Sequence, residues 1–328
     1  MCSGPSIPFK HGSARSATSG LHNGECHVND RETFLARRRH GIGASDIPAL
    51  LGISPFRYAT PMHIYMSKRG LLDEREDTPE QEAGQMLEPA IVRWFHKRHP
   101  EDEVSYNVDS EILSDPDEPW RRATPDGFVV AGDAEEPLDA KLVGDYMAGS
   151  WGPTNTQSGV AYYVVPQVNW QAGVMGATHW HVAALIGGRE LRTYRGAFDQ
   201  DLFDTSAEAA RVMWKRVQDG DPPPADGSDA YFDYLRAEYP GTPVPDRGGE
   251  AAIRAVGFDV DQLADTLLET TDELKELERE QKRLRQRLCA ETGDHDGLQG
   301  HGWHSTWRTN KRGTRVFRIS REDTSDGE

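Results

Sequence analysis

Two aspartates and a lysine have the residue types and the spacing of a phosphodiester-cleaving site. Asp139 and Lys141 are two residues apart in an expected strand, so their side chains leave the same face of a sheet. Asp126 lies thirteen residues earlier, at the start of the preceding expected strand, where hairpin pairing can bring its carboxylate alongside Asp139. Hydrolysis of a phosphodiester uses hard oxygen ligands to hold Mg²⁺ or Mn²⁺ against a phosphate oxygen. The two carboxylates are therefore candidate metal ligands.

A third acid and the lysine complete this candidate centre. Glu88, on an expected helix, is the third proposed ligand. A metal beside Lys141 would lower the pKa of its amine, which could then orient or deprotonate water, or stabilise the phosphorane. The spacing alone also fits a solvated strand. Leu138 and Leu142 flank the charged residues, and charges in such an apolar strand are costly unless a function uses them.

The elements that must position these residues form an α/β pattern. A capping box at Thr78 and Gln81 opens a helix that runs to about Lys97. Apolar runs and glycines predict further strands at about residues 104–108, 127–130, 138–142, 181–186 and 191–194, and further helices at about 30–39, 47–51, 166–176 and 200–217. The order predicts a mixed β-sheet flanked by helices.

The C-terminal part has a different pattern. Residues 225–258 are expected to be a Pro- and Gly-rich linker. Beyond it, apolar residues three and four apart predict a helix of about 30 residues with a narrow apolar seam, followed by a small basic β-hairpin around Gly313. Two interpretations of the seam stay open: packing on the rest of the chain, or self-association. The hairpin suits nucleic acid, and equally fits a small packed hairpin with solvated arginines.

Composition limits the class of protein. The 328 residues carry a net charge of -17, which argues against non-specific coating of nucleic acid, although residues 37–39 and 299–321 are locally basic. Three scattered cysteines do not form a disulfide framework. No apolar run is long enough to cross a bilayer, and residues 1–29 lack the features of a signal peptide. These features predict a soluble, cytoplasmic protein.

Six short segments, in order and with matching spacing, resemble the YqaJ-like viral recombinase family, relatives of lambda-type exonuclease. They are residues 39–46 (RHGIGASD), 50–55 (LLGISP), 84–89 (GQMLEP), 123–127 (ATPDG), 138–141 (LDAK) and 165–171 (VPQVNWQ). The similarity covers about Arg31 to Pro224. One departure is Asp139, where the family more often has Glu, which leaves the metal preference open.

The resemblance implies a restriction-endonuclease-like PD-(D/E)XK core that binds two Mg²⁺ ions, with Mn²⁺ as an option, and degrades one strand 5′ to 3′ from double-stranded DNA ends. It implies that Glu88, Asp126 and Asp139 are metal ligands and that Lys141 and Gln167 are catalytic. Gln171, one turn after Gln167, is interpreted as an ordinary exposed helix residue. Arg38, Arg39 and Ser45 match the segment that receives the 5′-phosphate.

The resemblance further implies a homotrimer, a single-strand-annealing partner protein and a phage or prophage origin. Two alternatives remain: an endonuclease on the same fold, and a DNA-binding protein without turnover. The expected domains are a disordered tail (1–29), a nuclease domain (30–224), the linker (225–258), the C-terminal helix and hairpin (259–321) and an acidic tail (322–328).

Overall fold

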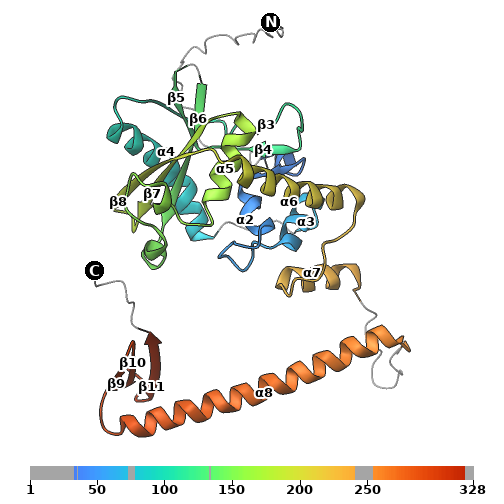
Figure 1. Cartoon of the computed structure of the whole chain (residues 1–328), viewed down its shortest axis with the longest axis vertical. Helices are drawn as coiled ribbons and strands as arrows, with labels where there is room; N and C mark the ends of the chain where they lie inside the picture. Colours follow the sequence, from blue (N-terminus) through green and yellow to red (C-terminus); the bar gives the residue numbers. More distant parts are fainter. Residues whose placement is uncertain (1–32, 35, 73–77, 133, 241–253, 322–328) are drawn as a thin grey trace, which may run out of the picture. The chain divides into compact units, whose positions relative to one another are not determined.

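The chain forms two compact units, Met1–Gly241 and Thr242–Glu328 (Figure 1). The computed structural model describes residues 33–34, 36–72, 78–132, 134–240 and 254–321. Both expected tails, 1–29 and 322–328, lie outside these residues. Of the helix expected over 30–39, residues 33–34 and 36–38 are described and are helical.

A five-stranded mixed sheet is the centre of the first unit. Its strands, in spatial order, are β2 (Glu103–Tyr106), β5 (Gly127–Ala131), β6 (Ala134–Val143), β7 (His179–Ile186) and β8 (Glu190–Ala197). Strands β6 and β7 pair in parallel, whereas the other neighbours are antiparallel. The turn between β5 and β6 contains Gly132 at a φ of 65°, a conformation that glycine adopts without strain.

Helices cover both faces of this sheet. Helix α4 (Pro79–Arg98), which begins at the expected capping box, packs Ile91 and Phe95 on the face that carries Leu138 and Ala140. Helix α5 (Val165–Met175) packs on the opposite face. Because side chains alternate along a strand, Asp139 and Lys141 lie on the α5 side.

A second hydrophobic core of the first unit lies around Trp170 of α5. Trp170 packs there with Ile42, with Ala123 and with residues of the neighbouring helices. Strands β1 (Ile42–Gly43), β3 (Leu113–Ser114) and β4 (Arg121–Ala123) form a separate small sheet. Further helices of this unit are α2 (Ile47–Leu50), α3 (Pro61–Arg69) and α6 (Gln200–Asp219). Its 3₁₀ turns are η1 (Ala44–Asp46), η2 (Asp145–Ser150) and η3 (Gln157–Gly159).

Part of the segment expected as a linker is a helix. Helix α7 (Asp229–Glu238) begins at Ser228, whose hydroxyl accepts a hydrogen bond from the Tyr231 amide. Tyr234 packs edge-on against Tyr65 of α3, with ring centroids 6.2 Å apart. Prolines before the helix dominate the local composition and predict a linker, whereas the contact between Tyr234 and Tyr65 leaves no local pattern in the sequence. The remaining domain limits stay predictions.

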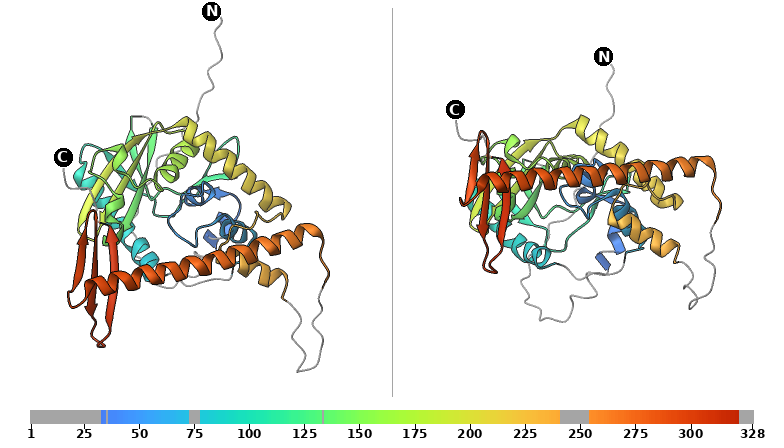
Figure 2. Two further views of the ribbon diagram at one scale, coloured as in Figure 1. Left: turned by 60° about the horizontal axis from the view of Figure 1, so that its bottom comes forward. Right: turned by 90° about the horizontal axis from the view of Figure 1, so that it is seen from below.

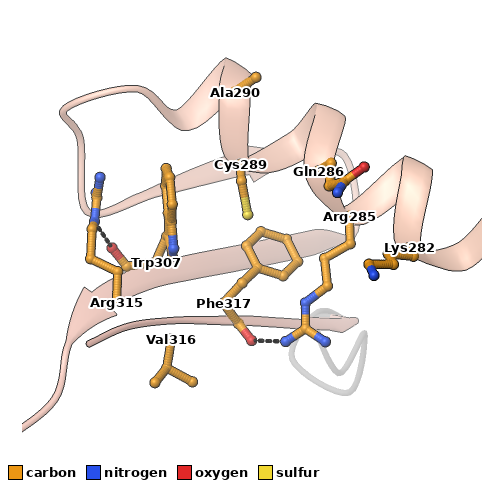
Figure 3. A pocket seen from close by; sticks show the side chains of 9 residues that line it. All are labelled: Lys282, Arg285, Gln286, Cys289, Ala290, Trp307, Arg315, Val316 and Phe317. Atoms are coloured by element: carbon orange, nitrogen blue, oxygen red, sulfur yellow. Dashed lines mark hydrogen bonds between the residues drawn. The ribbon is translucent and has the colours of Figure 1, made fainter. Parts of the chain in front are cut away.

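The second unit consists of one long helix and a small sheet. Helix α8 (Phe258–Thr292) runs as a single rod to an antiparallel sheet in the order β11-β10-β9 (Figure 2). The strands are β9 (Gly297–Gly300), β10 (Trp303–Thr309) and β11 (Arg315–Arg321). The expected hairpin is β10–β11, and β9 is an addition to it. Figure 3 shows a pocket between this hairpin and the end of α8, where Arg285 donates a hydrogen bond to the Phe317 carbonyl.

The predicted fold class is confirmed in its arrangement: a mixed sheet flanked by helices, followed by a long helix and a small antiparallel sheet. Within the described ranges, every helix is too short or too polar to span a bilayer.

Candidate active site

The β5–β6 hairpin brings Asp126 and Asp139 together. The Asp126 amide donates to the Leu138 carbonyl at 3.1 Å, and the Asp126 carboxylate accepts a 2.7 Å hydrogen bond from the Ala140 amide. Asp139 is 1% exposed. Burial, and next the negative charge of Asp139, raise the pKa of Asp126 well above its usual value. The two carboxylates therefore repel each other unless a positive charge lies beside them.

Lys141 supplies a positive charge to this pair. Its Nζ lies 2.5 Å from Asp139 Oδ2, and its side chain as a whole keeps 28% exposure. Burial lowers the pKa of Lys141, but the charges of Asp139 and Asp126 outweigh burial and raise it. The ammonium form is therefore favoured beside the carboxylates alone. A divalent cation would act in the opposite direction.

Glu88 approaches the same centre from helix α4. It lies one turn before the buried Ile91, where it is half-buried rather than part of the apolar face. Burial raises the pKa of Glu88; the charge of Lys141 lowers it and that of Asp139 raises it. The structure thus brings together all four residues of the sequence-predicted centre, within electrostatic range of one another.

Two glutamines of α5 hold Asp139 from the other side. Gln167 Nε2 and Gln171 Nε2 both donate to Asp139 Oδ1, at 3.0 and 3.1 Å. They are four residues apart, so they share one face of the helix. The interpretation of Gln171 as an exposed residue is wrong, because it is 1% exposed. The i, i+4 spacing from Gln167 was the signal that could have identified it.

The donor set fits a divalent cation. Apart from the Lys141 ammonium, Asp139 Oδ2 has no partner, and the buried Gln171 Oε1 has none among the described residues. Buried oxygens without hydrogen bonds are costly, and a cation would satisfy them. Asp126, Asp139 and Glu88 would hold such an ion, since Mg²⁺ and Mn²⁺ prefer carboxylate oxygens.

A different group of ligands is closer together. In the described part of the chain, His99, Glu101 and Asp102 have ligand atoms within 4.8 Å of one another. They lie at the end of α4, and His99 Nε2 lies within hydrogen-bond distance of Thr193 Oγ1, at 3.1 Å. Glu101 is exposed. Exposed acidic groups of this kind are common on protein surfaces, and nothing links them to Lys141.

The expected phosphate-binding residues are only partly assembled. Arg38 Nη2 donates a 2.7 Å hydrogen bond to Ser45 Oγ. Arg39 points elsewhere, since its guanidinium lies beside Gly70. The buried Lys68 pairs with Asp46 at 2.7 Å. Burial and the charge of Arg38 lower the pKa of Lys68, although Asp46 raises it. An anion at Arg38 and Ser45 would relieve this repulsion.

Helix α5 contacts both strand β4 and the carboxylate centre. Trp170 Nε1 donates to the Arg122 carbonyl at 2.9 Å, while Gln167 and Gln171 reach Asp139. The same helix therefore contacts strand β4 through Trp170 and Asp139 through its two glutamines.

Three aromatic rings contact one another, and one of them, Tyr163, lies within electrostatic range of Lys141. Phe56 stacks on Tyr58 at 5.6 Å and contacts Tyr163 edge-on at 5.9 Å. Burial raises the pKa of Tyr163, while the charge of Lys141 lowers it less. Phe56 and Tyr58 are exposed. These rings offer a stacking surface beside the carboxylate centre.

Comparison with known proteins finds a family whose model matches the segment that carries this centre. Residues 33–178 match the family model of the YqaJ-like viral recombinase domain. This segment of the chain is similar to the YqaJ-like viral recombinase domain, and the resemblance of its motifs is confirmed.

One relative matches almost end to end. "Uncharacterized protein YqaJ" of Bacillus subtilis (strain 168) is 26% identical over 283 residues, covering 85% of this chain and 83% of the relative. Among solved structures, an alkaline exonuclease (LHK-Exo) from Laribacter hongkongensis is similar with a TM-score of 0.45 and 14% identity, over 63% of this chain and 97% of that one. Its complex with dAMP gives a TM-score of 0.44 at the same coverage.

Proposed function

We propose that this chain is a metal-dependent DNA exonuclease of the YqaJ-like type. Asp126, Asp139 and Glu88 would hold Mg²⁺, or Mn²⁺, and the ions would supply a positive charge against the scissile phosphate and a water of lowered pKa. The observation that carries the proposal is the cluster of three partly or fully buried carboxylates around one lysine, in a YqaJ-like domain.

Other side chains around the carboxylates position the water, the metal ligand and the DNA. Lys141 orients the attacking water or donates to the phosphate oxygens from its position 2.5 Å from Asp139. Gln167 and Gln171 fix the carboxylate of Asp139, so that its second oxygen faces the reacting centre. The rings of Phe56 and Tyr58 stack against bases near the cleaved bond.

The substrate of this activity is a double-stranded DNA end. One strand is degraded 5′ to 3′, which leaves a 3′ single-stranded overhang for phage recombination. Arg38 and Ser45 receive the 5′-phosphate, with Arg39 contributing charge nearby. A homotrimer and a single-strand-annealing protein that takes the overhang belong to the same proposal.

Cleavage of linear and closed circular duplexes tests the activity and its mode. Each is incubated with Mg²⁺ or EDTA, and the linear duplex carries a label on the 5′ or the 3′ end of one strand. We expect Mg²⁺-dependent loss of the linear form, with the 5′ label released first. Nicking of the circle would replace this proposal with an endonuclease, and cleavage of neither would indicate a DNA-binding protein.

A further inference from the structure

The seam of helix α8 keeps a heptad spacing throughout, with two polar residues among its apolar ones. Its positions, three and four residues apart in turn, are Val260, Leu263, Leu267, Thr270, Leu274, Leu277, Gln281, Leu284 and Leu288. Leu263, Leu267 and Leu277 are 69%, 66% and 67% exposed. Heptads of this kind bury their seam against another helix.

The small sheet of the second unit packs on a different side of α8. Arg285 and Cys289 contact the β10–β11 hairpin, where Phe317 is buried (Figure 3). At 100° per residue these positions lie roughly a third of a turn from the seam. The hairpin therefore leaves the seam open from Val260 to Leu284, whereas Leu288, at its C-terminal end, is half-buried.

The two polar seam positions select a register. In an antiparallel pair centred between residues 275 and 276, Thr270 faces Gln281 of the second copy. The leucine positions then pair with one another: Leu263 with Leu288, Leu267 with Leu284, and Leu274 with Leu277. Val260 falls outside these layers, opposite Glu291. A shift by one heptad would place Gln281 against Leu263, leaving a polar group against an apolar one.

Charge selects the direction. Residues 258–269 contain four acidic residues and no basic one, whereas residues 282–290 contain four basic residues and no acidic one. A parallel pair would place like charges together at both ends, while an antiparallel pair places each acidic end on a basic end. We infer that α8 pairs with α8 of a second copy of this chain, antiparallel, through its leucine seam.

Disulfide trapping in the full-length chain tests both the partner and the direction. Two proteins, Leu267→Cys and Leu284→Cys, are made separately in a background with Cys2→Ser, Cys26→Ser and Cys289→Ser. They are oxidised alone and after co-incubation. The antiparallel pair predicts a disulfide-linked dimer in the mixture and none from either protein alone. Cross-linking of each protein with itself would mean a parallel pair and would overturn the proposal.

A charged substitution gives an independent test of the seam. Leu267→Asp is expected to halve the particle mass measured by light scattering. Leu268→Asp is the matched control, because Leu268 is also exposed, at 63%, but lies outside the seam. It should leave the mass unchanged. No cross-link in the mixture, together with an unchanged mass for Leu267→Asp, would show that the chain's own first unit covers the seam.

Discussion

Strand β6 carries two buried carboxylates, Glu136 and Asp139, on opposite faces, and their surroundings differ. Glu136, 3% exposed, lies 2.7 Å from His181 Nε2 and accepts from Arg195 Nη2 at 3.3 Å. Burial raises the pKa of Glu136, but the hydrogen bond with His181 and the charge of Arg195 outweigh it, so the pKa is lowered.

On the other face, Asp139 has Asp126 as its neighbour, and the pKa of Asp126 is raised. The charge of Glu136 is balanced by its neighbours, whereas the cluster around Asp139 has more negative charge than Lys141 can balance. A buried carboxylate is therefore not by itself a sign of function. The sign of function is a buried cluster whose negative charge is not balanced by neighbouring positive groups, because such a cluster favours binding of a cation.

The largest expected effect separates the site from the rest of the fold. Lys141→Ala should lower the cleavage rate by roughly 10³-fold, because the variant loses the group beside the reacting phosphate. DNA binding, measured by fluorescence anisotropy, should remain. Lys97→Ala, at an exposed lysine of α4, is the control and should cleave normally. Equal loss of cleavage and binding would mean that Lys141 is structural.

Removing the charge of Glu136 should destabilise the fold. Glu136→Gln should lower the free energy of unfolding by about 2 kcal/mol, since Arg195 loses its ionic acceptor. Because the folded-state pKa is lowered, the Glu136 contribution is present above the unfolded pKa and is lost as pH falls through the folded one. Urea titrations across pH measure this. The exposed neighbour variant Glu135→Gln should change stability little; equal effects would remove the contrast.

Removing a hydrogen-bond donor to Asp139 should raise the Mg²⁺ requirement for cleavage more than it changes stability. Gln171→Leu keeps the side-chain volume but removes the donor to Asp139 Oδ1. The Mg²⁺ concentration that gives half-maximal cleavage should rise about tenfold, as expected for partners that orient a metal ligand. Gln262→Leu, at an exposed position of α8, controls for the substitution. An unchanged Mg²⁺ requirement would exclude this positioning role.

Removing charge from the cluster around Asp139 should have the opposite effect on stability. Asp126→Asn keeps an acceptor for the Ala140 amide but ends the repulsion with Asp139, so it should raise the free energy of unfolding in EDTA by on the order of 1 kcal/mol. A raised folded-state pKa means that the wild type loses stability as pH rises above the unfolded pKa near 3.8. The variant should lack this loss. Thermal melts at several pH values check it, and destabilisation at neutral pH would contradict the account.

The smallest effect concerns the end of the substrate. Arg38→Ala should reduce the preference for a 5′-phosphorylated end about fivefold, because its guanidinium contacts Ser45. Arg39→Ala should change the preference less, since that side chain lies beside Gly70. Digestion rates of phosphorylated and dephosphorylated duplexes give the comparison. A larger effect at Arg39 would reverse the assignment.

The sequence predicted the carboxylate pair because a strand has a period of two and a hairpin aligns neighbouring strands. The same local rules predicted helix α4 with its cap and the β7–β8 pair. Gln171 and the choice between Arg38 and Arg39 depend on how α5 and the Ala44–Asp46 turn dock, which no local pattern contains. Helix α7 was overlooked because its tyrosines are anchored by distant residues such as Tyr65.

On the proposed function, Asp126, Asp139 and Glu88 serve a cleaving metal rather than the fold. The rate of linear-duplex cleavage in Mg²⁺ by wild type and by Asp126→Asn, measured beside the melting temperature of each in EDTA, tests this directly. We expect the variant to melt higher and to cleave at least about 10³-fold more slowly. A variant that still cleaves at the wild-type rate would contradict the proposed function.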